Sequence, residues 1–345
     1  MGNPAMTNKT IDSNPDRRPR VGLALGSGSA RGLANLGVIR AIEDAGIEVV
    51  CVAGTSMGAL VGAIYAAGKL GELETTFLGF DWKKTAAFFD VVLPKSGLLD
   101  GDRVSEMVRA HVHADAIESL PIPFAAVATD IVSGEEVNIR SGDVIEAVRA
   151  SISVPGIFTP VRSNGRILVD GGLTNPVPVS AAHAMGADFV IAVDLNHEIV
   201  AGKNLKPLGG AGKSGKAESD ASDMLSRWVG EYRSSMKDIR QKLLSLDNPA
   251  SAQFRKWTST EEPLPNIFDV LLASINIMET RITHTRLQLD KPDMIIQPPL
   301  GHIRFLEFDR AGEIIEIGYE HAQRQLASLP DLAFNAGKGL FPIQG

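Results

Sequence analysis

The sequence predicts an α/β protein built on a parallel sheet that helices cover on both faces. Short, nearly continuous apolar runs that alternate with helical patterns are typical of such a sheet. The first two runs, Val21–Gly26 and Val49–Gly54, each end in glycine and lead into a helical pattern. With 345 residues, the chain is long enough for one large domain of this class or for two of ordinary size.

The remaining elements repeat this alternation along the chain, without an internal repeat. Strands are expected, in chain order, at Val21–Gly26, Val49–Gly54, Phe124–Asp130, Arg166–Asp170, Phe189–Leu195 and Met294–Pro298. Helical periodicity predicts helices at Arg31–Gly46, Met57–Gly68, Asp102–His113, Asp143–Ala150, Pro178–Met185 and Gly312–Ser328.

Composition and charge limit the classes of function. Hydrophobic residues make up 44% of the chain and charged residues 22%, which is typical of a globular protein. The formal net charge of -7 argues against a nucleic-acid partner, since phosphate binding requires a concentrated basic surface. The single cysteine, Cys51, forms neither an intrachain disulfide nor a metal cluster, which fits a reducing cytoplasm. No window holds the roughly 18 uncharged apolar residues of a membrane-spanning helix, so any membrane contact is expected to be peripheral.

Polar segments define the expected domain boundaries. Residues 1–18 lack an apolar stretch of signal-peptide length and are predicted to be a disordered N-terminal tail. Residues 331–345 are predicted to be a C-terminal tail, which leaves 19–330 as one domain. An insertion at about 201–262 interrupts this domain and contains the Gly/Ala/Ser/Lys linker Pro207–Ser222.

The second half of the insertion predicts a helix with an apolar stripe. Apolar residues from Leu225 to Leu243 recur at alternating spacings of four and three, as on one face of a helix about five turns long. Residues 201–260 carry 11 Lys and Arg against 6 Asp and Glu. Two interpretations remain open for this helix: a lid or membrane-surface helix, or a stripe that packs on the core or on another subunit. For a second stripe, in the helix Ile267–Ile282, packing is favoured.

Gly54-Thr55-Ser56-Met57-Gly58 is the strongest chemical signal in the sequence. A G-x-S-x-G pentapeptide between an apolar strand and a helix is typical of a nucleophile elbow, a turn so sharp that neighbouring side chains must be hydrogen. Ser56 would then stand at a helix N-terminus, where unpaired N–H groups and the helix dipole favour developing negative charge. The competing interpretation is a tight glycine turn without chemistry.

A second glycine-rich loop, Gly26-Ser27-Gly28-Ser29-Ala30-Arg31-Gly32, also follows a strand and opens a helix. Successive backbone N–H groups in such a loop form a cradle for an anion, either a dinucleotide pyrophosphate or the oxyanion of an ester. The dinucleotide fingerprint requires a third glycine where Arg31 stands, and an acidic residue at the end of the next strand, where the chain has Ser56. The oxyanion interpretation is therefore favoured.

Asp170-Gly171-Gly172 ends a short strand and offers a carboxylate. An Asp before two glycines is usually a turn, but Ser56 needs a base. None of the seven histidines lies in a glycine-rich loop after a clear strand, although His197 comes close. A Ser–His–Asp triad would have to use His302, which is both late in the chain and in a predicted loop.

The motifs GSGSARG, GTSMG and DGG, in this order, resemble those of the patatin-like phospholipase family, most closely its small bacterial members. Segments Ala150–Pro160 and Asp293–Leu300 are also typical of that family, and the resemblance covers residues 20–200 and 265–330. It implies a three-layer α/β/α fold with a mainly parallel central sheet, so that 19–330 would be a patatin-like catalytic domain. It also implies lipid acyl ester hydrolysis by a Ser–Asp dyad without histidine, metal or other cofactor.

Carried over residue by residue, the resemblance makes Ser56 the nucleophile and Asp170 its dyad partner. The backbone N–H groups of Gly28 and Ser29 match the oxyanion positions, and Arg31 matches the basic residue beside them. The chain departs from many plant and animal members in having serine, not glycine, at 27 and 29. Serine supplies its N–H equally well provided that the position needs no positive φ. The motif glycines are Gly26, Gly54, Gly58, Gly171 and Gly172.

The predicted reaction is hydrolysis through an acyl-serine intermediate by a phospholipase, lysophospholipase or carboxylesterase of the cytoplasm. Peripheral contact of the insertion helix with the inner face of the membrane is a hypothesis. Burial must raise the pKa of Asp170, because an ordinary aspartate, with a pKa of about 3.9, is a weak base for serine. Two alternatives are a non-catalytic regulator that binds lipid or protein on the same fold, and an esterase with a Ser–His–Asp triad. The sequence defines no oligomeric state.

Overall fold

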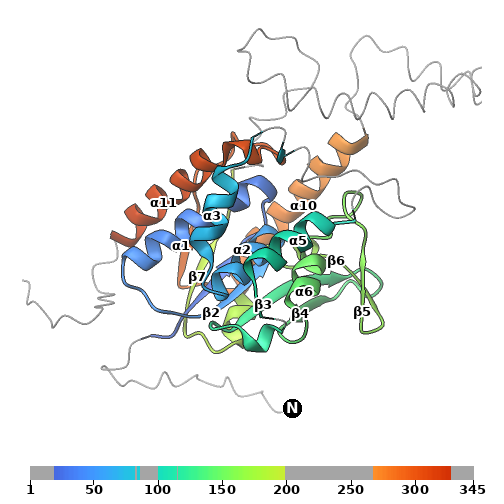
Figure 1. Cartoon of the computed structure of the whole chain (residues 1–345), viewed down its shortest axis with the longest axis horizontal. Coiled ribbons are helices and arrows are strands. Elements are labelled where there is room, and N and C mark those ends of the chain that lie inside the picture. The colour runs from blue at the N-terminus through green and yellow to red at the C-terminus, as the bar shows by residue number, and fades with distance from the viewer. Residues whose placement is uncertain (1–18, 82–83, 86–99, 115, 199–266, 328–345) are drawn as a thin grey trace, which may run out of the picture.

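The computed structural model describes residues 19–81, 84–85, 100–114, 116–198 and 267–327 (Figure 1). Within them a central sheet carries helices on both faces, which confirms the predicted three-layer α/β/α class with its mainly parallel sheet. The predicted tails at 1–18 and 331–345, and the insertion at 201–262 with its Leu225–Leu243 helix, lie outside the described residues.

The described sheet has eight strands in the order β5-β6-β3-β2-β1-β7-β8, with β4 paired to β3. Strands β3, β2, β1, β7 and β8 are parallel to one another, whereas β4, β5 and β6 pair in antiparallel fashion. Their bounds are β1 Val21–Leu25, β2 Val49–Thr55, β3 Phe124–Asp130, β4 Glu136–Ile139, β5 Val161–Ser163, β6 Arg166–Asp170, β7 Phe189–Val193 and β8 Met294–Ile296.

The larger part of the core lies between the sheet and a layer that contains α1, α2, α3, α5, α6 and α11. Helix α7 covers the opposite face with a smaller apolar cluster. The bounds are α1 Ala34–Asp44, α2 Met57–Ala66, α3 Leu70–Leu78, α5 Asp102–His111, α6 Val144–Ser151, α7 Val179–Ala184, α10 Ile267–Asp290 and α11 Ala311–Ala327. Short 3₁₀ turns are η1 Ser29–Leu33, η2 Ile117–Ser119, η3 Gly171–Leu173 and η5 Phe308–Arg310.

The burial of the central strands explains why they appear in the sequence as apolar runs. Every residue of β1 and β3 is buried, as expected for strands in the middle of a sheet covered on both faces. Helix α2 is buried along its whole length and accordingly has no polar face. Sequence patterns did not predict helix α3 or the short strands β4 and β5. The two strands lie towards the margin of the sheet, carry polar residues and are only partly buried, so they lack an apolar run.

Strand β3 has two neighbours along one of its edges, and this positions the site. Residues 124–127 pair with β2 and residues 126–129 with β4, so β2 and β4 occupy opposite edges. Residues 128–130 pair with β6, which must share the edge of β2 because β4 already occupies the other. Strand β2 ends at Thr55, opposite Val127, and β6 ends at Asp170, opposite Ala128. The two strands therefore meet end to end.

Helix α10 differs in detail from the stripe predicted for Ile267–Ile282. Ile275 packs in the core and Leu271 lies against it, as expected, but Met278 is about half exposed. The buried face continues instead through Glu279 and Thr283, one turn apart. Among the described helices, none is both long and apolar enough to cross a membrane.

Candidate active site

Ser56 occupies the sharp turn between β2 and α2. Its backbone has φ 57° and ψ -121°, a conformation that non-glycine residues adopt only under constraint, at a cost on the order of 1–3 kcal/mol. A Cβ on Gly54 would lie 2.3 Å from the Gly58 carbonyl oxygen, and one on Gly58 would lie 2.2 Å from the Leu25 carbonyl oxygen. The two glycines are therefore required by close backbone approach, and the geometry is that of a nucleophile elbow.

A buried serine that sequence reasoning did not single out holds this elbow in place. The Ser56 amide donates a hydrogen bond of 2.9 Å to Ser151 Oγ, and Ser151 Oγ donates one of 2.5 Å to the Val127 carbonyl. Ser151 is fully buried at the end of α6. The hydroxyl thus connects the strained residue to the neighbouring strand β3.

Asp170 lies at the end of β6, next to the elbow and 2% exposed. Its Oδ1 accepts a 2.7 Å hydrogen bond from the Gly172 amide, and its own amide donates to the Ser153 carbonyl at 2.9 Å. The Ser56 hydroxyl also interacts with the carboxylate as a donor. Oδ2 is buried without a partner at standard hydrogen-bond geometry, so the contact with Ser56 is a loose one. Catalytic pairs are often loose before substrate binds.

Burial gives Asp170 the electrostatics that a base requires. Loss of solvation raises the pKa of this carboxyl from 3.8 to about 6, against the opposing effect of hydrogen bonds from Ser56 and Gly172. The raised pKa makes the carboxylate a stronger proton acceptor, yet leaves it ionised at neutral pH. The direction of this shift is the one that a base for Ser56 would need.

The loop after β1 presents two free amides to Ser56. Gly26 directly follows the strand, and the Ser27 amide donates to the Pro176 carbonyl at 2.9 Å. Within the described residues, neither the Gly28 nor the Ser29 amide has an acceptor. Both residues line one cavity with Ser56. Ser29 has φ 49°, so the condition under which serine would serve as well as glycine at this position is not met.

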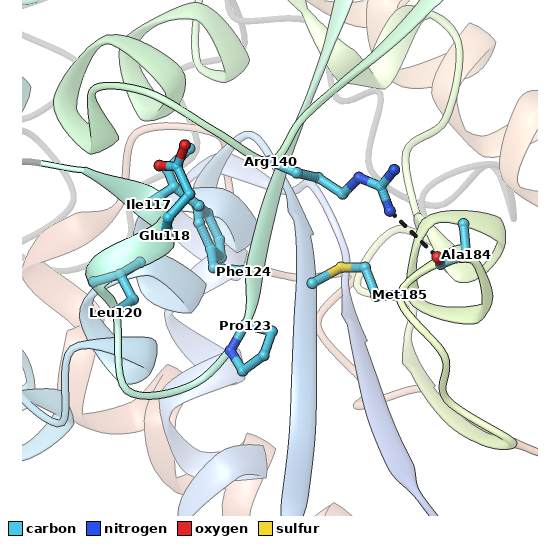
Figure 2. Close-up of a pocket in the computed structure, with 8 residues that line it drawn as sticks. All are labelled: Ile117, Glu118, Leu120, Pro123, Phe124, Arg140, Ala184 and Met185. Atoms are coloured by element: carbon cyan, nitrogen blue, oxygen red, sulfur yellow. Dashed lines mark hydrogen bonds between the residues drawn. The ribbon is translucent and has the colours of Figure 1, made fainter.

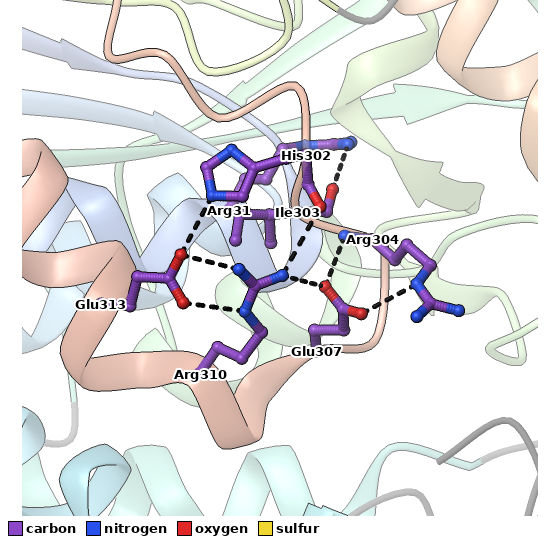
Figure 3. Close-up of polar contacts among 7 residues, drawn as sticks. All are labelled: Arg31, His302, Ile303, Arg304, Glu307, Arg310 and Glu313. Atoms are coloured by element: carbon purple, nitrogen blue, oxygen red, sulfur yellow. Dashed lines mark hydrogen bonds and ion pairs between the residues drawn. The ribbon is translucent and has the colours of Figure 1, made fainter. Parts of the chain in front are cut away.

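The Arg31 side chain does not line the Ser56 cavity and forms hydrogen bonds elsewhere. Its guanidinium donates to the Ile303 carbonyl at 3.2 Å, drawn in Figure 3, and to Asn276 Oδ1 at 3.3 Å. Arg31 is 4% exposed, and burial lowers its pKa to about 10, against the attraction of Glu279. These contacts favour a role in joining the loop to α10 and the 300–307 segment over direct contact with an oxyanion.

Glu279 of α10 is a second buried carboxyl at the site, and sequence reasoning missed it. Its Oε2 accepts hydrogen bonds from Ser27 Oγ at 3.1 Å and from Asn196 Nδ2 at 3.2 Å. It lines the same cavity as Ser56. The sequence places Glu279 in the predicted helix Ile267–Ile282, but the apolar stripe of that helix does not indicate that a glutamate beside it is buried.

The cavity at Ser56 is narrow and mainly apolar. Its volume of about 50 Å³ corresponds to a few water molecules. Four lining residues come from the polar site: Gly28, Ser29, Ser56 and Glu279. The others are apolar side chains from five stretches of the chain: Met57, Leu60, Val104, Ile152, Val154, Phe158, Ile275, Phe305 and Phe308. Such a lining suits a hydrocarbon chain better than a polar substrate.

A larger cavity, of about 420 Å³, lies at the amino-terminal end of β3, and Figure 2 shows its lining residues. Phe124, which begins β3, contributes to it, whereas Ser56 follows the end of the parallel strand β2. Arg140 crosses this cavity and donates to the Ala184 carbonyl at 3.2 Å. Its residues provide no nucleophile with a base: Ile117, Glu118, Leu120, Pro123, Phe124, Arg140, Ala184 and Met185.

The histidine that a triad would require lies on the surface. His302 is half exposed, and its Nε2 contacts Glu313 Oε1 at 3.0 Å, within the ion-pair network of Figure 3. Among the described residues, no histidine lines the Ser56 cavity. The surroundings of Ser56 therefore favour Asp170 as its partner.

Fold and site together define an α/β protein with a serine elbow beside a buried carboxylate, and similarity to known proteins agrees. The family model described as "Patatin-like phospholipase" matches residues 23–183. An uncharacterized NTE family protein of Mycobacterium tuberculosis (strain ATCC 25618 / H37Rv) is 32% identical over 343 residues, covering 89% of this chain and 91% of that protein. The chain belongs to the patatin-like phospholipase family, and the resemblance seen in its motifs is confirmed. Membership implies a lipid hydrolase.

Two further likenesses are more partial. Patatin-like phospholipase domain-containing protein 6 of Mus musculus is 32% identical over 185 residues, which cover 52% of this chain and 14% of that protein. The crystal structure of VipD from Legionella pneumophila aligns with a TM-score of 0.44 at 15% identity, covering 90% of this chain and 67% of that one.

Proposed function

We propose that this protein hydrolyses lipid acyl esters through an acyl-serine intermediate, with Ser56 as nucleophile and Asp170 as the base. The observation that carries the proposal is the end-to-end meeting of β2 and β6 on one edge of β3. That meeting brings a serine on a strained elbow beside a buried carboxylate with an unpartnered oxygen. The free amides of Gly28 and Ser29 border the same cavity.

In the first half of the reaction, Ser56 Oγ attacks the ester carbonyl carbon while its proton passes to Asp170 Oδ2. The carbonyl π electrons move to oxygen, and the Gly28 and Ser29 amides stabilise the resulting oxyanion. Each such donor contributes on the order of 3 kcal/mol to transition-state stabilisation. The C–O bond to the alcohol then breaks, and the departing oxygen takes the proton from Asp170.

In the second half, Asp170 removes a proton from water, and the hydroxyl oxygen attacks the acyl carbon. Collapse of this intermediate releases the fatty acid and returns the proton from Asp170 to Ser56 Oγ. The buried setting supports both halves, because the raised pKa of Asp170, about 6, reduces the mismatch with the alcohol whose proton it must accept.

The apolar lining supports a fatty acyl substrate, in agreement with the family. Phospholipids, lysophospholipids and simple carboxylic esters all present such a chain. We also propose peripheral membrane contact through the insertion at 201–262; helix α10, which follows it in the sequence, exposes Val270, Ile277 and Met278. Co-sedimentation with anionic phospholipid vesicles tests this contact. Removal of residues 207–245 should reduce binding, and equal binding of both proteins would exclude the insertion as the contact.

The central test is hydrolysis of p-nitrophenyl esters of increasing acyl length by the wild type and three variants. Ser56→Ala and Asp170→Asn should each lower kcat/KM by at least about a thousandfold, as expected for the loss of nucleophile or base. His302→Ala is the control, and should retain the wild-type rate, since that side chain is half exposed and paired with Glu313. Full activity of folded Ser56→Ala would overturn the proposal, and loss in His302→Ala would favour a triad. A folded wild type inactive on every ester would favour a lipid-binding regulator.

A further inference from the structure

Glu279 links α10 by hydrogen bonds to the loop after β1, residues 26–32, which we call the oxyanion loop because it carries the free amides of Gly28 and Ser29. Its Oε2 receives hydrogen bonds from two side chains, Ser27 Oγ and Asn196 Nδ2. Asn196 Nδ2 also donates to Ser27 Oγ at 3.2 Å, which closes a three-residue cluster. Ser27 directly precedes Gly28, one of the two residues with free amides. The position of the oxyanion loop therefore depends on a carboxyl group from a distant helix.

Glu279 also lies close to Asp170, across Gly172. A methyl group built on Gly172 would be 2.1 Å from Glu279 Oε1 and 3.1 Å from Asp170 Oδ1. The two oxygens are thus no farther apart than the sum of these distances. The second glycine of the Asp170-Gly171-Gly172 motif is required here, because any side chain would occupy the space of the Glu279 carboxyl.

Ionising both the Asp170 and the Glu279 carboxyl in this small buried volume would cost free energy through charge repulsion. Within the described residues, the charged groups that face Glu279 are Asp170 from β6 and Arg31 from η1. Arg31 offers partial compensation, since its guanidinium hydrogen-bonds to Ile303 and Asn276. Burial and the neighbouring Asp170 together raise the pKa of Glu279 from 4.5 to about 8.

Building on the proposed function, we propose that Glu279 is a positioning residue that acts as a neutral carboxylic acid. It anchors Ser27 of the oxyanion loop and leaves Asp170 as the one negative charge beside Ser56. Its Oε2 accepts two hydrogen bonds, so the proton resides on Oε1. Ionisation of Glu279 would add a second negative charge to the cavity in which the oxyanion develops, and would oppose its formation.

The first test is the pH dependence of kcat/KM for wild type, Glu279→Gln and Glu279→Ala, with Glu316→Gln as a surface control on α11. Rates are corrected with Ser56→Ala for non-enzymatic hydrolysis. Wild type and control should lose about tenfold in kcat/KM between pH 7 and pH 9, as one carboxyl with pKa about 8 ionises. The side chain introduced in Glu279→Gln cannot ionise. The ratio of kcat/KM at pH 9 to kcat/KM at pH 7 should therefore be about tenfold higher in this variant than in wild type. Glu279→Ala should be slower than Glu279→Gln at pH 7.

Persistence of the alkaline decline in Glu279→Gln, or equal rates for the Gln and Ala variants, would overturn the proposal. Unfolding measurements provide a readout that needs no substrate. A folded-state pKa above the unfolded value means that stability is lost as pH rises from 4.5 to about 8. Glu279 should contribute up to about a thousandfold to the rise of the wild-type unfolding equilibrium constant over that range. Glu279→Gln should lack this contribution and keep only the smaller rise caused by Asp170. A wild type that hydrolyses no ester but shows this difference would refute the function alone, and equal pH dependence of stability in wild type and Glu279→Gln would refute the neutral acid.

Discussion

Removal of one hydroxyl group, in Ser151→Ala, should weaken both the fold and the candidate site. Ser151 Oγ accepts from the Ser56 amide at 2.9 Å and donates to the Val127 carbonyl at 2.5 Å, and the residue is fully buried. Alanine removes both hydrogen bonds and creates almost no space for water. A buried polar group left without a partner costs about 1–3 kcal/mol, so the two groups together should lower the free energy of unfolding by about 2–6 kcal/mol.

The same change should also reduce activity, because the elbow at Ser56 is a strained conformation that its surroundings must hold. If the strain relaxes by about 1.4–2.8 kcal/mol, kcat/KM should fall about 10-fold to 100-fold. Urea denaturation and ester hydrolysis measure the two effects. Ser274→Ala is a matched control, since Ser274 is exposed on α10 and, within the described part of the chain, its hydroxyl bonds to Val270 of its own helix alone. A Ser151→Ala protein within 0.5 kcal/mol of wild type and fully active would refute the reasoning.

Three further predictions follow from the burial of Gly172, Asp170 and Cys51. Gly172→Ala should destabilise the protein by about 1–3 kcal/mol through its clash with Glu279, and the penalty should shrink in a Glu279→Ala background, as a double-mutant cycle of denaturation curves would show. Values of kcat/KM should fall as pH drops through about 6, because protonated Asp170 accepts no proton; a limb that reports a group of ordinary pKa near 3.9 would contradict this. Burial raises the pKa of Cys51 to about 11, so native protein should react with iodoacetamide at pH 8 far more slowly than urea-unfolded protein, and equal rates would argue against the β2 position.

Local patterns were enough to predict the framework of the fold. Strands that are buried on both faces must be apolar, so β1, β2, β3 and β7 stood out in the sequence. Strand β4 has half-exposed polar residues and no such constraint, so it left no comparable signal. The elbow at Ser56 was likewise predictable, because the close backbone contacts at Gly54 and Gly58 leave glycine as the fitting residue.

Contacts between distant segments were not predictable in the same way. The sequence points to Asp170 only through the need of Ser56 for a base and through the resemblance of the motif to a family. The pairing of β2 and of β6 with the same edge of β3 depends on long-range registers. Ser151 is one of many serines, and only its position beside the elbow distinguishes it. Glu279 was missed because a carboxyl in the middle of a helix normally faces water, and periodicity alone does not reveal a buried charge.

The most direct test of the central claim is to locate the nucleophile chemically. A fluorophosphonate probe reacts with an activated serine, and intact-mass spectrometry followed by peptide mapping identifies the modified residue. Wild-type protein should carry one adduct per chain, on Ser56, with a much slower reaction in Asp170→Asn and none in Ser56→Ala. An adduct on another serine, or a folded wild type that the probe never modifies, would contradict the account.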